Sequence, residues 1–152
     1  MTNTEKELVK NYPEAAAFAG VAASVWNGST SPAKVEMVVK GRLYTELKRL
    51  LNKDIQTVFL TDSDIRHIKK KHGSNESAKG QADITPDDFA LIPLVLNEFD
   101  KVEHSLTDKL GYKKLLFQKN CGGMVYVATV ERGETKVEVR TFWKMHVPSA
   151  SC

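Results

Sequence analysis

The chain has 152 residues, a length typical of a single domain that buries its own hydrophobic core. Its 41% hydrophobic and 27% charged residues exclude a disordered, collagen-like or coiled-coil protein. No apolar run approaches the roughly 20 residues that span a bilayer, and the mixed acidic and basic N-terminus does not resemble a signal peptide. We therefore expect a folded cytoplasmic protein that does not insert into a membrane.

The two cysteines, Cys121 and Cys152, have no histidine or second cysteine at metal-ligand spacing. We expect two free thiols in a reducing compartment. The sequence also has no glycine-rich phosphate loop, dinucleotide fingerprint or metal-ligand cluster. We therefore expect neither a metal nor a cofactor, and most common enzyme classes lose support.

The net charge of +3 is unevenly distributed. Residues 83–100 contain five acidic and no basic side chains, whereas residues 101–152 contain nine basic and five acidic ones. This asymmetry allows a cationic surface that attracts a polyanion, although the net charge is too small to require one.

The N-terminal region is predicted to be helical and separate. Residues 4–25 favour one or two helices, interrupted at Pro13. The turn-forming residues 27–32 then break the pattern. We therefore divide the chain into a helical appendage, residues 1–33, and a main domain, residues 34–152.

The main domain is predicted to open with a short strand near residues 35–39 and an amphipathic helix that contains Leu43, Leu47 and Leu51. A short buried segment follows at residues 58–60.

Two further helices carry clear start signals. Thr61 as N-cap and Asp64 at the capping-box position predict a helix over residues 62–72. Pro86 in the first turn predicts a second helix over residues 86–97, with a kink or a split between residues 91 and 94 because Pro93 lies inside it.

From residue 100 onward the hydrophobic period becomes two. Strands are predicted near residues 101–106, 112–119, 123–131 and 135–144, joined by short glycine-containing turns. The predicted fold class is therefore α+β, with N-terminal helices followed by a four-stranded antiparallel sheet.

The predicted helix 62–72 concentrates groups that could carry chemistry. His67 and Lys71 share one face through their i, i+4 spacing, and His72 lies on the stripe of Ile65 and Ile68 that faces the sheet. Either histidine suits proton transfer beside cations that bind phosphate. The alternatives are a solvated surface position for His67 and helix-end stabilisation by His72.

The last predicted strand offers a second set of groups. Arg140 and Lys144 alternate with Thr141 and Trp143 across the pleat, so both cations are expected on one face. They could bind a phosphate or stabilise a pentavalent transition state. An outward polar strand face is the alternative.

Residues 60–68, 84–89 and 141–144, in this order and spacing, resemble the phage-encoded barnase–EndoU–colicin–RelE-like (BECR) nucleases over about residues 40–145. That family combines two helices with a four-stranded antiparallel sheet. The resemblance implies metal-independent RNA cleavage, in which a base activates the ribose 2′-hydroxyl and a 2′,3′-cyclic phosphate forms.

The resemblance also implies a set of site residues. The helix motif falls on His67, Lys71 and His72 and the strand motif on Thr141, which we take as candidate catalytic residues. The candidate RNA phosphate-binding residues are Lys70, Arg140 and Lys144.

The leading hypothesis is a ribonuclease that acts as a toxin or phage effector on tRNA or another RNA, with an inhibitor or immunity protein as a further partner. The alternative is a non-catalytic RNA- or protein-binding domain on the same fold. A third hypothesis is a virion structural accessory whose N-terminal helices mediate assembly.

Overall fold

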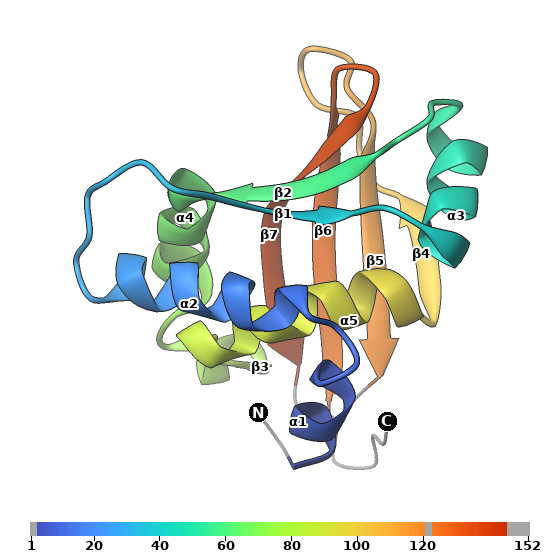
Figure 1. Cartoon of the computed structure of the whole chain (residues 1–152). Helices are drawn as coiled ribbons and strands as arrows, with labels where there is room; N and C mark the ends of the chain where they lie inside the picture. Colours follow the sequence, from blue (N-terminus) through green and yellow to red (C-terminus); the bar gives the residue numbers. More distant parts are fainter. Residues whose placement is uncertain (1–2, 121–122, 146–152) are drawn as a thin grey trace.

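The computed structural model describes residues 3–120 and 123–145, so Cys121 and Cys152 lie outside the described residues. Figure 1 shows the elements. The α-helices are α1 (Asn3–Val9), α2 (Glu14–Trp26), α3 (Gly41–Leu51), α4 (Asp62–His72) and α5 (Leu91–Glu98), and the 3-10 helices are η1 (Glu76–Lys79) and η2 (Pro86–Ala90). The strands are β1 (Lys34–Val38), β2 (Thr57–Thr61), β3 (Gln81–Ala82), β4 (Lys101–His104), β5 (Lys114–Asn120), β6 (Met124–Arg132) and β7 (Lys136–Met145).

The predicted antiparallel meander is confirmed, because β4, β5, β6 and β7 pair antiparallel in chain order. The expected four-stranded sheet is too small. Within the described residues the sheet has seven strands in the order β1-β2-β7-β6-β5-β4, with β3 paired to β7. The sequence concealed this because β2 joins β7 in parallel across a long stretch of chain, a pairing that no hairpin turn marks.

Strand β7 is paired on its outer edge only at its two ends. β2 pairs with residues 136–138 and β3 pairs with residues 144–145. Helix α4 connects these strands along the chain and packs against β7, at one end of the sheet (Figure 1). The middle of β7 therefore lies next to a helix on its outer edge.

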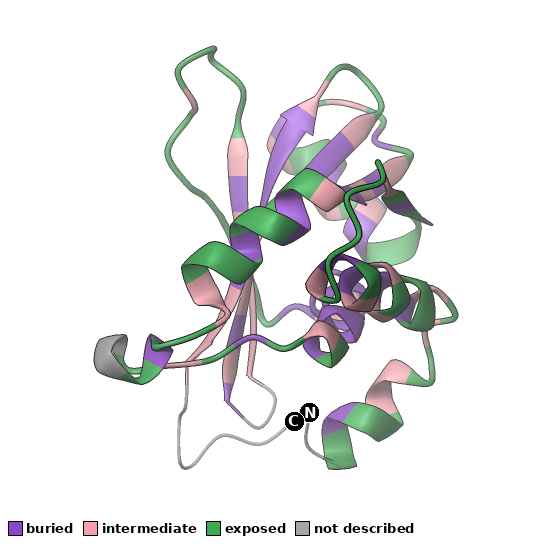
Figure 2. Cartoon of the chain, turned by 90° about the vertical axis from the view of Figure 1, so that its left-hand side faces the viewer, coloured by how far each residue is buried: buried purple, intermediate pink, exposed green. Residues whose placement is uncertain are grey.

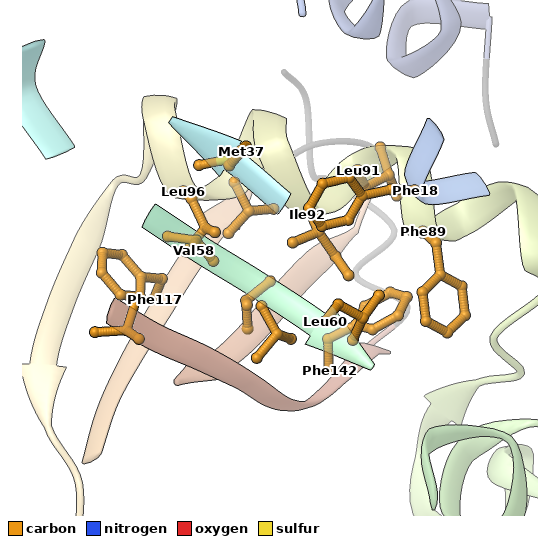
Figure 3. Close-up of a cluster of buried hydrophobic side chains, with 14 of the residues drawn as sticks. Phe18, Met37, Val58, Leu60, Phe89, Leu91, Ile92, Leu96, Phe117 and Phe142 are labelled. Carbon is orange, nitrogen blue, oxygen red and sulfur yellow. The ribbon is translucent and has the colours of Figure 1, made fainter. Parts of the chain in front are cut away.

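The hydrophobic core lies between one face of the sheet and helices α2 and α5. Figure 3 shows helix residues such as Phe18 and Ile92 meeting strand residues such as Val58 and Leu60. Figure 2 shows the opposite face of the sheet without a covering layer of helices. None of the described helices is long and apolar enough to cross a membrane.

The predicted helix boundaries agree closely with the structure. Helix α4 spans residues 62–72 and begins with the expected capping box between Thr61 and Asp64. The predicted split of the second helix is also confirmed, because η2 changes to α5 at Leu91. Pro93 lies in the first turn of α5, where its missing N–H removes no helical hydrogen bond.

Helix α2 packs as part of the core rather than apart from it. Phe18, Ala22 and Val25 belong to the same buried cluster as the sheet residues. Trp26 packs edge-to-face on Phe89 of η2, with ring centroids 5.6 Å apart. The division at residue 33 stays a prediction, and this packing leads us to expect that removal of residues 1–33 uncovers the core.

Candidate active site

Helix α4 is held in a fixed orientation by its first turn. The Asp64 amide donates to Thr61 Oγ1 at 3.2 Å, and Asp64 Oδ2 accepts from the Thr61 amide at 3.1 Å. Ile65 and Ile68 are fully buried, as the sequence predicted. Because His67 lies outside this buried stripe, its side chain is exposed.

Strand β7 contains a bulge beside this helix. Thr141 pairs with Ala128 and Val139 pairs with Thr129, so Arg140 has no partner on β6. An extra residue of this kind re-aims the side chains that follow it. Val139 and Phe142 are consequently both fully buried, which an uninterrupted two-residue alternation cannot produce.

The bulge places Arg140 against helix α4. Its Nη1 atom lies 3.2 Å from Asp64 Oδ1 and 3.5 Å from Glu138 Oε2. The Arg140 side chain is 47% exposed, so the guanidinium is positioned by buried carboxyl groups and remains accessible to a ligand.

The two carboxyl groups beside Arg140 have pKa values that are shifted in opposite directions. Burial, followed by the hydrogen bond to Glu138, raises the pKa of Asp64 to about 7. Burial also raises the pKa of Glu138, but hydrogen bonds with Asp64 and Arg132 outweigh it and hold that pKa below its ordinary value. When Asp64 is protonated, Arg140 faces one carboxylate charge rather than two, so positive charge remains available at the surface.

His67 lies within the electrostatic influence of this arginine. Partial desolvation of the ring by the surrounding protein, followed by the positive charges of Arg140 and Lys71, lowers the pKa of His67 below its ordinary value. The imidazole is therefore mostly neutral at pH 7 and can accept a proton beside cations that attract phosphate. His67 and Lys71 both lie on α4, where their i, i+4 spacing places them on one face of the helix.

His72 faces the sheet, as the sequence predicted, and is held there by two contacts. Its Nδ1 atom lies 3.0 Å from Oε2 of the buried Glu76. Its ring stacks on Trp143 with centroids 5.8 Å apart, and Trp143 stacks on Tyr126 at 5.1 Å. Since Glu76 occupies Nδ1, the Nε2 atom is the one left to contact a ligand.

The three rings form an aromatic platform on the uncovered face of the sheet. Tyr126 alternates with the buried Val125 and Val127, and Trp143 follows the buried Phe142, so both rings point away from the core. Tyr126 and Trp143 are both partly exposed. A planar group can therefore reach this platform from solvent.

Thr141 lies on the same side of β7 as Trp143, two residues away, which is about 7 Å along a strand. Its Oγ1 atom is buried and forms no hydrogen bond with any residue in the described part of the chain. An unsatisfied buried hydroxyl is costly, so Thr141 Oγ1 would gain a partner if movement of a neighbouring side chain opened it to a hydrogen-bonding ligand.

The expectation that Arg140 and Lys144 share one face is wrong. Lys144 Nζ lies 2.9 Å from Oδ1 of Asp88, a fully buried residue at the start of η2, whereas Arg140 contacts α4. The bulge between Val139 and Thr141 separates the two cations. Lys70 is directed away from β7, into a cleft on the other side of α4.

Sequence reasoning missed several of these contacts. The sequence predicts only a strand around Tyr126, because its pairing with Trp143 depends on register. Glu76 stands four residues after His72, a spacing that signals contact in a helix but not across a loop. The capping motif identifies Asp64 as part of a helix start, and nothing in the sequence indicates its pairing with Glu138.

Metal ligands are not grouped in this region: among residues 3–120 and 123–145, no three His, Cys, Asp or Glu side chains are arranged to hold a metal ion.

Comparison with known proteins gives one match. The model of the family phage-Barnase-EndoU-ColicinE5/D-RelE like nuclease 3 matches residues 37–149, which include α4, β7 and the aromatic platform. No curated protein and no solved structure matches the chain. The match covers well over half of the chain, and it agrees with the resemblance of the helix and strand motifs. The chain belongs to the phage-Barnase-EndoU-ColicinE5/D-RelE like nuclease 3 family.

Proposed function

We propose that the protein is a ribonuclease that cleaves RNA by attack of a ribose 2′-hydroxyl on the adjacent phosphodiester. The observation that carries this proposal is that the exposed His67 projects from α4, whose first turn binds the half-exposed Arg140 of the β7 bulge, and that the charge of Arg140 helps to lower the pKa of His67. A proton acceptor and a fixed cation at one point are what this reaction needs.

The proposed reaction proceeds in one displacement. His67 takes the proton of the 2′-hydroxyl as the bond from O2′ to phosphorus forms. Arg140 and Lys71 stabilise the charge on the pentavalent phosphorus, and the Thr141 hydroxyl donates to one of its oxygens. The bond from phosphorus to O5′ breaks, His72 Nε2 supplies a proton to O5′, and a 2′,3′-cyclic phosphate remains on the other product.

The aromatic platform supports a single-stranded substrate. Stacking of a base on an aromatic side chain contributes about 1–3 kcal/mol, and it requires an unpaired base. Trp143 stacks with both His72 and Tyr126, so a base would extend this row of rings by stacking on the partly exposed Tyr126. A loop or an unpaired segment of tRNA or another RNA fits this arrangement.

The test is incubation of RNA oligonucleotides with the purified protein in EDTA, followed by analysis of the 3′ ends. We expect cyclic-phosphate ends and no cleavage where the scissile nucleotide is 2′-deoxy. His67→Ala and His72→Ala should lower the rate by about 10²–10⁴-fold. His104→Ala is the matched control, because this exposed ring lies on β4, away from α4, and its Nε2 atom is 3.2 Å from the Leu50 carbonyl oxygen.

Two outcomes would contradict the proposal. Cleavage of DNA at the same rate as RNA would show that the 2′-hydroxyl is not the nucleophile. Salt-sensitive RNA binding without turnover would favour the alternative, a non-catalytic RNA-binding domain in which the same platform and cations supply affinity. The roles of toxin or phage effector, and an inhibitor or immunity protein that covers this site, stay predictions.

A further inference from the structure

A basic cleft lies on the side of α4 that faces away from β7. It has a volume of about 470 Å³ and is formed by the turn that follows α2 together with α4 and the residues just after it. Its polar lining consists of Ser29, Thr30, Arg66, Lys69, Lys70 and Ser74. The lining thus combines three cations with three hydroxyl groups and contains no carboxylate.

Two of the cations are held in place by the protein. Lys69 Nζ lies 3.4 Å from the Trp26 carbonyl oxygen and 5.6 Å from the centre of the Trp26 ring. Arg66 is ion-paired with Asp62 on the same helix, and its side chain remains 47% exposed. Within the described residues, no carboxylate lies within ion-pair distance of Lys70.

The opposite wall of the cleft is a defined turn. Gly28 has φ +97°, a conformation that other residues rarely adopt, and the Ser29 amide donates to the Ser24 carbonyl oxygen at 3.0 Å. These features fix Ser29 and Thr30 across from α4. The contact with the Trp26 carbonyl oxygen accounts for the position of Lys69, and the ion pair with Asp62 accounts for that of Arg66, but neither accounts for Lys70 or for the facing hydroxyls.

Hydroxyl and cationic donors around a small cleft suit a phosphate group, which offers oxygen acceptors and negative charge. Consecutive residues of a helix point about 100° apart. Lys71 therefore lies toward His67 while Lys70 lines the cleft, and Lys70 is among the charges that lower the pKa of His67. The two basic regions are neighbours around one helix, which is about 10 Å wide.

We propose that this cleft binds a backbone phosphate of the polynucleotide, so that the strand leaves the candidate active site and continues around the outside of α4. The inference rests on the proposed function only in taking a nucleic acid as the ligand. It adds a second binding site that takes no part in the chemistry. Figure 2 shows the exposed outer surface of α4 that the strand would follow.

The experiment measures binding without cleavage. Fluorescently labelled 2′-O-methyl RNA of 3 and 12 nucleotides, which lacks the attacking hydroxyl, is titrated with the full chain in EDTA at several salt concentrations. The double variant Arg66→Gln/Lys70→Gln is compared with Lys109→Gln/Lys113→Gln, which removes the same charge from exposed positions in the β4–β5 loop. Melting curves check that both variants fold.

We expect the cleft variant to bind the 12-mer about tenfold more weakly than the control. The slope of log affinity against log salt concentration should become shallower by about 0.7 for each phosphate of a single strand that the variant no longer binds. The affinity for the 3-mer should change no more than in the control. Equal salt slopes for the two double variants would overturn the proposal.

Two further results separate the possible explanations. If the 12-mer binds the cleft variant as weakly as expected but unmodified RNA is not cleaved by the wild type, the cleft stands and the ribonuclease proposal fails. Protection of Lys70 from acylation reports occupation of the cleft. If inorganic phosphate protects Lys70 but the 12-mer does not, the ligand of the cleft is a free anion, and the inference of a backbone site is overturned.

Discussion

Arg140 and Asp64 link the bulge of β7 to the first turn of α4, with Nη1 of the arginine 3.2 Å from Oδ1 of the aspartate. The same Asp64 side chain closes the capping box with Thr61. The residue that starts the helix therefore also positions the cation of the candidate site. A change at Asp64 is expected to affect stability and the surface charge together.

We predict that the wild-type protein becomes less stable as the pH rises from about 4 to about 7, and that Asp64→Asn abolishes this loss of stability. The native carboxyl holds its proton up to about pH 7, whereas an unfolded one loses it near pH 4. Unfolding therefore releases a proton in this window, and stability decreases as the pH rises through it. Asparagine carries no titrating proton, yet its amide can donate to Glu138 as the protonated acid does.

Urea denaturation at pH 5 and pH 8 measures this effect. The drop in midpoint between these pH values should be smaller in Asp64→Asn than in the wild type. Asp87→Asn, in η2, is the control and should keep the wild-type difference, because Asp87 is not buried. An unchanged pH dependence in Asp64→Asn would show that the carboxyl is ionised throughout.

The second prediction concerns the pH dependence of cleavage. Because partial desolvation and then the charges of Arg140 and Lys71 lower the pKa of His67, the acid limb of kcat/KM should lie below pH 6.5. Lys71→Gln removes one of these charges, so the pKa of His67 should rise and the limb should move to higher pH. The rate should also fall, but the shift of the limb is the diagnostic measurement.

The matched control is Lys114→Gln. Lys114 is a half-buried lysine of β5, which is separated from β7 by β6, so its substitution should leave the acid limb in place. If His67→Ala keeps the wild-type acid limb, another group is the base.

The helix and strand periods were visible in the sequence because they depend on local spacing. The capping box of α4 and the split at Leu91 were predicted on that ground and are present. The parallel pairing of β2 with β7 was not predicted, because it joins residues 57–59 to residues 136–138. No local pattern reports a contact at that separation.

The site was predictable to a similar degree. The helical wheel indicated that His67 and Lys71 share a face and that His72 turns toward the sheet. The common face of Arg140 and Lys144 was wrong because one inserted residue in β7 reverses the alternation. A bulge is a property of two paired strands, so the sequence of one strand does not disclose it.

The third prediction tests the aromatic platform. Tyr126→Leu keeps an apolar side chain but removes the ring at the end of the row, where a base would stack. Removal of one base-stacking interaction costs about 1–3 kcal/mol, so kcat/KM for RNA should fall about 5- to 150-fold. Leu116→Ala, which alters a partly exposed residue of β5, is the control and should leave kcat/KM near wild type. Full activity of Tyr126→Leu would exclude stacking at this position.

The fourth prediction assigns Lys144 to stability. Its ammonium group pairs with the fully buried Asp88, and its own side chain is 19% exposed. Removal of one partner from a buried pair costs about 3–5 kcal/mol, and the partial exposure of Lys144 places Lys144→Met toward the lower end. Lys101→Met, which breaks an exposed pair with Glu103, should change stability by less than about 1 kcal/mol.

Thermal unfolding measures the difference between these two lysine variants. At about 2–4 °C for each kcal/mol in a chain of this size, Lys144→Met should lower Tm by roughly 6–12 °C. If Lys144→Met melts like the wild type but binds RNA with a reduced salt dependence, Lys144 contacts phosphate, as its position in the sequence motif suggested.

The last prediction concerns residues 1–33. The sequence predicts that these residues form an appendage separate from the main domain, but α2 contributes the fully buried Phe18 and Ala22 to the core. Without α2, the apolar surface of η2 and α5 would be exposed to water. A chain that starts at Ser31 is therefore expected to lose its cooperative melting transition.

Phe18→Ala in the full chain should cost about 3–5 kcal/mol, the range for a buried phenylalanine. Val38→Ala is the control, because this side chain is 66% exposed, and it should cost less than about 1 kcal/mol. A truncated chain that melts cooperatively near the wild-type Tm would support a separate appendage, and the packing of α2 would then be dispensable for folding.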